Sequence, residues 1–141
     1  MASIEELRAM LDAARDDLIA AIMAAGAVWE QSPPDADESD DEEHWSPRKV
    51  AEHVVGSEFY YAGRLASGLG QPEPQRPDFQ FADPAEALVG LAMTVETLSP
   101  IYATITATDL AREAGSGTVE ALWDFLAHHC DDHAQQIRAA T

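Results

Sequence analysis

Apolar side chains recur at every third or fourth position in four separate stretches of the chain, which is the periodicity of amphipathic helices. The first stretch opens with Ser3 and Glu6, whose spacing matches a capping box, and its periodicity fades near Ala27. Its apolar stripe comprises Leu7, Leu11, Ala14, Leu18, Ile22 and Ala25. The pattern therefore predicts a helix that begins after Ser3 and ends near Ala27.

The other three stretches also open on signals that start helices. The pair Ser46-Pro47 predicts the first residues of a second helix, because serine caps helix N-termini and proline suits the first helical position. The pair Asp83-Pro84 predicts the start of a third helix in the same way. A fourth helix is expected to begin near Thr118 and to run to the end of the chain.

A long segment, residues 71–81, separates the second and third predicted helices. It is rich in proline and glutamine, which favours an extended connection, and Phe79 and Phe81 are expected to hold it against the bundle. The chain shows no alternating strand pattern and no internal repeat. Four helices of about 20 residues with one long connection predict an all-α four-helix bundle with one long crossover, in a single domain over residues 1–141.

Residues 30–44, EQSPPDADESDDEEH, lie between the first two predicted helices and combine two prolines with a block of acids. The first ligand positions of a calcium-binding loop are matched by Asp35, Asp37 and Ser39. However, Asp40 stands where that loop requires glycine, and Ser46 stands where it requires a closing glutamate. The segment is therefore interpreted as a solvated acidic loop.

The formal net charge is −18, with 26 acidic residues against 8 lysines and arginines. Such a charge opposes binding to the phosphates of nucleic acids and to anionic membranes. No apolar run reaches the roughly 18 residues of a membrane span, and the first residues lack a signal-peptide pattern. We therefore expect a cytoplasmic protein that binds neither nucleic acid nor membranes. The single cysteine, Cys130, excludes an internal disulfide.

Three of the five histidines and the only cysteine fall in the stretch HHCDDH near the end of the chain. At about 100° per residue, His133 lies in the apolar stripe of the fourth helix, His129 lies at its edge and His128 faces the acidic side. Two imidazoles four residues apart can bind one divalent ion, although two hydrogen-bonded core histidines would show the same spacing. The first candidate for a third ligand is His53, and His44 in the acidic loop competes with it.

Two motifs in the chain resemble the DinB superfamily of four-helix bundles. The stretch HWSPRKVAEHVVGSEFYYAGRL resembles its second helix, in which a Trp-Ser pair precedes a metal-binding histidine, here His53, and a later acid, here Glu58. The stretch HHCDDHAQQI resembles its fourth helix, whose pattern is His, three residues, His, two residues, Gln and an aliphatic residue, here Ile137. The order and length of the predicted helices also fit this family.

The resemblance implies a site in which His53, His129 and His133 bind one divalent ion, nickel or zinc. Three neutral imidazoles leave the charge of the ion intact and a coordination position open. Relatives in this family use a low-molecular-weight thiol, such as mycothiol or bacillithiol, in S-transfer or isomerisation, so a thiol cofactor is implied as well. Relatives also commonly dimerise, which implies a homodimer.

Other residues near these motifs have two interpretations each. Three aromatic residues either line a pocket above the metal or belong to the core: Trp45, Tyr60 and Tyr61. Gln136 either hydrogen-bonds at the site or is a bystander, and Glu58 either supports a histidine or faces solvent. Cys130 fits a small core residue better than an extra ligand. Only Lys49 and Arg64 supply positive charge on the His53 side of the second helix.

The sequence is compatible with two main function classes and, as a weaker third option, with a stable bundle whose site is degenerate. The first is a metal-dependent enzyme with a small-molecule substrate, which acts by S-transfer, isomerisation or hydrolysis with a metal-activated thiol or water. The second is a non-catalytic bundle, metal-binding or stress-related, that acts through protein partners. A pocket that opens onto the metal position would favour the enzyme.

Overall fold

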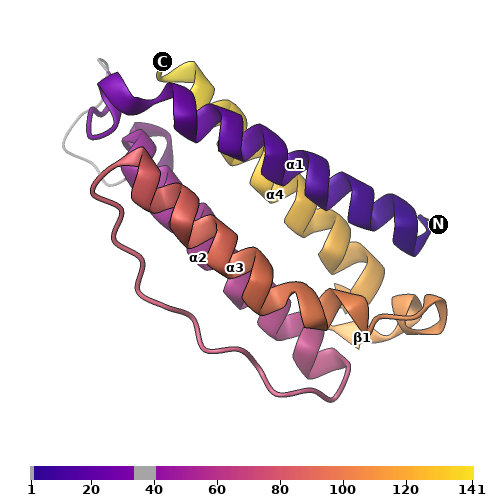
Figure 1. Ribbon diagram of the computed structural model, residues 1–141. Coiled ribbons are helices and arrows are strands. Elements are labelled where there is room, and N and C mark those ends of the chain that lie inside the picture. The colour runs from indigo at the N-terminus through magenta and orange to yellow at the C-terminus, as the bar shows by residue number, and fades with distance from the viewer. Residues whose placement is uncertain (1, 34–40) are drawn as a thin grey trace.

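The computed structural model describes residues 2–33 and 41–141, and within them it consists of four long helices, short 3-10 turns and one small hairpin (Figure 1). The long helices are α1 (Ile4–Ala24), α2 (Pro47–Gly68), α3 (Pro84–Ala103) and α4 (Val119–Ala139). The short turns are η1 (Gly26–Val28), η2 (Glu42–His44) and η3 (Ala107–Ala111). The predicted all-α bundle is confirmed. The calcium-loop positions considered above, Asp35, Asp37 and Ser39, lie outside the described residues.

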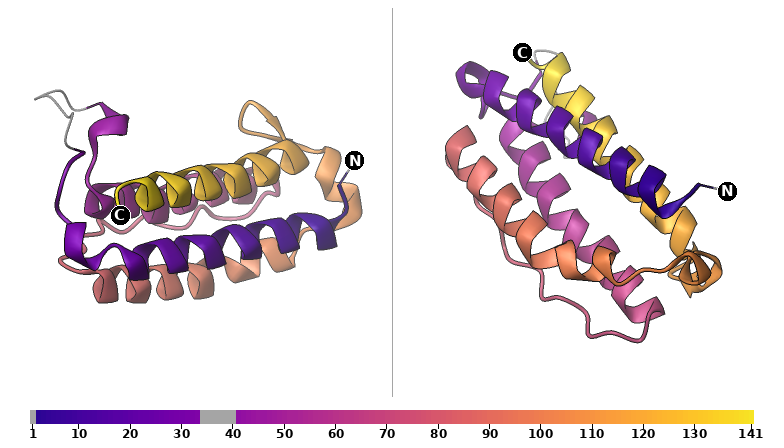
Figure 2. Two further views of the ribbon diagram at one scale, coloured as in Figure 1. Left: turned by 90° about the horizontal axis from the view of Figure 1, so that it is seen from above. Right: turned by 45° about the vertical axis from the view of Figure 1, so that its right-hand side comes forward.

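The four helices lie along one common axis, with α1 and α4 running in one direction and α2 and α3 in the other (Figures 1 and 2). Helix α4 packs against both α1 and α2, α2 packs against α3, and the contact between α1 and α3 is sparse. The segment 71–81 returns along the length of the bundle, as the parallel direction of α2 and α3 requires. This is the predicted long crossover.

Each long helix begins with a side-chain cap. Ser3 accepts a hydrogen bond from the backbone N–H of Glu6 at 3.1 Å, and Ser46, Asp83 and Thr118 cap the other helices in the same way. The caps satisfy N–H groups that have no partner inside the helix, each stabilising its helix by about 1 kcal/mol. The starts of all four helices are thus fixed by local chemistry.

The crossover is held by its last residues, as the two phenylalanines predict. The indole N–H of Trp29 donates to the carbonyl of Phe81 at 2.9 Å, and the ring of Phe81 is buried. A Cβ on Gly90 of α3 would lie 2.4 Å from that ring, so only glycine permits this approach. The backbone N–H of Phe81 also donates to Glu52 of α2, which ties the start of α3 to α2.

A feature that the sequence analysis did not predict precedes α4. Strands β1 (Glu113–Ala114) and β2 (Gly117–Thr118) form an antiparallel hairpin of two residues each. Gly115 turns the chain between them with a φ of +62°. The hairpin is too short to show an alternating pattern, so its pairing depends on where α3 and α4 place its ends.

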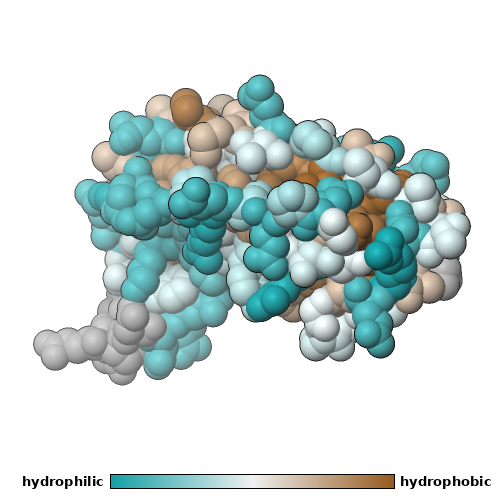
Figure 3. Space-filling view, turned by 90° about the horizontal axis from the view of Figure 1, so that it is seen from below, coloured by the Kyte–Doolittle hydropathy of each residue, from teal (hydrophilic) through white to brown (hydrophobic). Residues whose placement is uncertain are grey.

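The core runs the length of the bundle and leaves a polar exterior. Figure 3 shows hydrophilic side chains spread over one face, with apolar residues visible between them. Buried side chains from all four helices form the interior, with Trp123, Leu7, Leu18 and Leu65 among the largest. In the described part of the chain, no helix combines the length and apolar character needed to cross a bilayer.

Candidate metal centre

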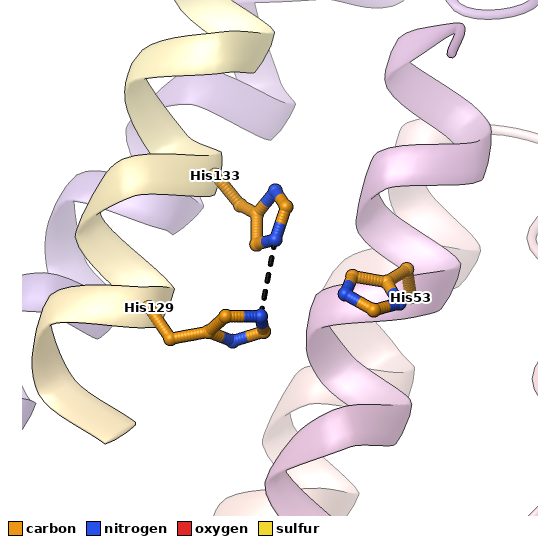
Figure 4. A group of neighbouring side chains, drawn as sticks. All are labelled: His53, His129 and His133. Atoms are coloured by element: carbon orange, nitrogen blue, oxygen red, sulfur yellow. Dashed lines mark hydrogen bonds between the residues drawn. The ribbon is translucent and has the colours of Figure 1, made fainter. Parts of the chain in front are cut away.

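Three histidines from two facing helices meet between α2 and α4 (Figure 4). His129 and His133 lie one turn apart on α4, and their Nε2 atoms are 3.1 Å apart. His53 projects from α2 towards them, with its ring centre 5.3 Å from that of His129 and 4.9 Å from that of His133. One nitrogen from each ring lies within 4.8 Å of the other two, which is close enough for all three to hold one ion.

Gln136 fixes the orientation of the His133 ring. Its amide nitrogen donates to the backbone carbonyl of Glu42 at 2.7 Å, so its amide oxygen is the atom that faces His133. That oxygen lies 2.9 Å from His133 Nδ1 and therefore accepts the Nδ1 proton. In the neutral ring, Nε2 then presents its lone pair to the other histidines, which is the form that binds metals.

Burial keeps two of the histidines neutral. Burial, followed by the neighbouring His133 and His53, lowers the pKa of His129 to about 4. Burial and His133 also lower the pKa of His53, while Glu42 acts in the opposite direction. Neutral imidazoles at pH 7 are the ligand form, so the site is prepared to accept a cation without first releasing protons from these rings.

Aromatic rings pack against two histidines of the cluster. Trp45 packs edge-on against His53 with ring centres 5.1 Å apart, and Tyr61 packs edge-on against His129 at 5.5 Å. Phe125, which the sequence analysis did not single out, stacks on His129 at 5.7 Å. Tyr60 contacts Tyr61 and is half exposed, so it lies one layer further out. Phe125 lies four residues before His129, so the helical spacing could have identified it as a neighbour of that histidine.

Glu42 is the acidic residue that the sequence analysis missed. It begins the 3-10 turn η2, and its Oε1 lies 3.1 Å from Nε2 of His133. The sequence placed it in an acidic loop, where nothing distinguishes it from the acids around it. Only the contact between η2 and α4, made through Gln136, brings its carboxylate to the histidines.

The crossover also brings a positive charge to the site that the sequence analysis did not anticipate. The guanidinium of Arg76 lies against Gly56, where an added Cβ would be 2.7 Å from one of its nitrogens. Its charge contributes to lowering the pKa of His53. Arg64, by contrast, lies over the ring of Tyr60, and Lys49 lies over the ring of Trp45.

The remaining two histidines lie outside the cluster. His128 is exposed, and its Nδ1 lies 2.9 Å from the carbonyl of Asp124. The contact with that carbonyl and the charge of Asp124 raise the pKa of His128. His44 lies in η2 beside Glu43, at 3.8 Å. Among the described residues, the group able to share one ion contains neither of them.

Glu58 fits neither of its two sequence interpretations. It is buried, and its carboxylate accepts hydrogen bonds from Arg15 of α1 at 3.1 and 2.5 Å and from the Tyr102 hydroxyl at 3.3 Å. It therefore neither supports a histidine nor faces solvent. Cys130 is a buried core residue outside the ion-sharing group, and burial raises the pKa of its thiol to about 12.

The fold and the cluster define a four-helix bundle with a three-histidine centre between its second and fourth helices. The family model described as the DinB superfamily matches residues 10–137, so the chain belongs to this superfamily. The resemblance found in the two sequence motifs is thereby confirmed. No significant match was found among curated proteins or among solved structures.

Proposed function

We propose that this protein binds one divalent metal ion through His53, His129 and His133 and uses it to transform a small molecule. The observation that carries the proposal is the convergence of three imidazoles within 4.8 Å, two of them kept neutral by burial. A structural zinc site is usually closed by four protein ligands, whereas three histidines are typical of catalytic sites. Zinc and nickel both accept imidazole ligands, so both are candidates.

The surroundings of the site support a small-molecule substrate. A hollow of about 290 Å³ is lined by Tyr61 and Phe125, which also contact the His129 ring, and by residues of the hairpin and the start of α4. Such a volume suits the apolar part of a small ligand rather than a macromolecule. None of the described residues that line the hollow is a histidine, so Tyr61 and Phe125 are its link to the metal centre. A divalent ion bound by the histidines would lower the pKa of a water or thiol and so supply a nucleophile at neutral pH.

The residues around the ion would orient that chemistry. Gln136 holds His133 in one tautomer, and the rings of Phe125 and Tyr61 pack against His129 and restrict its orientation. The charge of Arg76 acts on His53, and Lys49 lies over the ring of Trp45, which packs against His53. Two positive charges are too few to hold a multiply charged thiol cofactor on their own. Water or a small thiol of low charge is therefore the proposed nucleophile.

Metal content of purified variants tests the ligand set. The wild-type chain should hold one zinc or nickel ion per chain after loading and desalting, and His133→Ala should hold far less, because two imidazoles bind an ion more weakly than three. His128→Ala is the matched control, since it removes an adjacent, exposed histidine on the same helix. Loss of metal in His128→Ala with retention in His133→Ala would overturn the proposal.

The nature of the nucleophile can be tested on the cobalt-loaded protein. Addition of a simple thiol such as cysteine should produce a sulfur-to-cobalt charge-transfer band if a thiol takes the open position. If no such band appears and the protein hydrolyses a substrate, the result supports water as the nucleophile. A protein that binds the ion but neither thiol nor substrate would instead have the non-catalytic, partner-binding role.

A further inference from the structure

The Nε2 atom of His133 faces two other electron-rich atoms at the same distance. Nε2 of His129 and Oε1 of Glu42 both lie 3.1 Å from it. Because Gln136 accepts the Nδ1 proton of His133, Nε2 carries a lone pair in the neutral ring. A proton on Nε2 could form a good hydrogen bond to only one of these two atoms. A cation placed between the residues could instead be bound by all three atoms.

The two distances also agree with the edges of a coordination shell. Ligand atoms about 2.0–2.2 Å from a tetrahedral zinc ion lie roughly 3.3–3.6 Å from one another. The contacts from His133 Nε2 to His129 and to Glu42 are both close to that separation. A carboxylate oxygen is also an ordinary zinc ligand, and it would complete a tetrahedral set with three imidazoles.

The turn that carries Glu42 is attached to α4 at this point. The Gln136 side chain bonds to the backbone carbonyl of Glu42 and to the ring of His133 simultaneously, so one amide sets the separation of the two residues. The carboxylate of Glu42 thus contacts His133 but lies outside the group of atoms that are all within 4.8 Å of one another, so it would turn towards the ion to bind it.

We propose that the carboxylate of Glu42 is the fourth protein ligand of the metal and occupies the open position until a substrate or thiol displaces it. The inference rests on the metal-binding function proposed above. Three ligands come from helices, but Glu42 comes from a 3-10 turn and its side chain is 54% exposed. A ligand on such a turn can leave the ion at little cost to the core, which makes it the exchangeable member of the set.

The test compares zinc affinities of Glu42→Gln and Glu43→Gln in the full chain, measured by competition with a chromogenic chelator. Both variants lose one negative charge from the same turn, and Glu43 contacts His44 rather than the cluster. Partners that only support a ligand are worth about 10–100-fold in affinity, so loss of a direct ligand should weaken zinc binding by at least about tenfold. Glu43→Gln should stay within about twofold of wild type, since a screened surface charge acts weakly.

A second readout separates ligation from an ion pair between Glu42 and a protonated His133. The visible absorption of the cobalt-loaded protein reports its ligand set, so it should change in Glu42→Gln and remain the same in Glu43→Gln. Glu42→Asp keeps the charge but draws the carboxylate back by one methylene, and it should also weaken zinc binding. Equal zinc affinity and identical cobalt spectra in wild type and Glu42→Gln would overturn the inference, whereas a wild-type chain without metal would overturn the proposed function instead.

Discussion

Replacing Glu58 with alanine should destabilise the protein by about 3–5 kcal/mol, the cost of leaving a buried charge without its partner. Arg15 of α1 and Glu58 of α2 form a bidentate pair across the core, and their side chains are only 10% and 6% exposed. Burial alone lowers the pKa of Arg15, but the charge and hydrogen bonds of Glu58 outweigh it, and the net shift is upward. The variant removes this compensation, but a guanidinium keeps its proton even when buried, so Arg15 stays charged there.

The structure offers little that could replace the lost carboxylate. Asp12 lies 3.7 Å from Arg15, but its side chain is 65% exposed, and an ion pair in that setting contributes at most about 1 kcal/mol. The hydroxyl of Tyr102 also loses its acceptor, at a cost of about 1 kcal/mol or more. Replacing both charged residues, with Arg15→Met and Glu58→Leu, should recover most of the loss, because no uncompensated charge then remains in the core.

Urea unfolding followed by helical circular dichroism measures these differences by linear extrapolation. Glu30→Ala is the matched control: Glu30 also pairs with an arginine, Arg48, but its side chain is 66% exposed, so the loss should be at most about 1 kcal/mol. A Glu58→Ala loss below about 1 kcal/mol would refute the reasoning. So would a double variant as unstable as Glu58→Ala, because the penalty would then not come from the unpaired charge.

Two further predictions concern charge. The melting temperature should rise between low salt and about 0.15 M salt, because repulsion among 26 acids opposed by 8 basic residues becomes screened, and a flat or falling value would contradict this. Acidification should release the bound metal only below the ordinary imidazole pKa of about 6.5. In the metal-free protein the pKa of His129 is about 4 and the pKa of His53 is also lowered. Protons therefore compete with the metal for these rings only at lower pH. Metal content after dialysis at stepped pH measures this, and half-loss already at pH 6.5 would be the contrary result.

The helix starts and the pairing of two histidines could be predicted from the sequence because they depend on near neighbours along the chain. A cap such as Ser3 acts on an N–H three residues away, and His129 and His133 share a face because four residues make about one helical turn. The helical phase also separated buried His133 from exposed His128 without any knowledge of the partner helix. His53 was assigned to the same site through the family pattern, and the structure brings it there.

Glu42 and Glu58 could not be assigned in the same way, because their partners are distant in sequence. Glu42 lies in a run of acids, and a turn does not impose a fixed spacing that would indicate which acid reaches His133. Glu58 occupies a helical position compatible with several neighbours, and its partner Arg15 is 43 residues earlier. Which side chains meet across the bundle depends on how the helices pack and where η2 docks on α4, and both are decided by the sum of many weak contacts rather than by local preference.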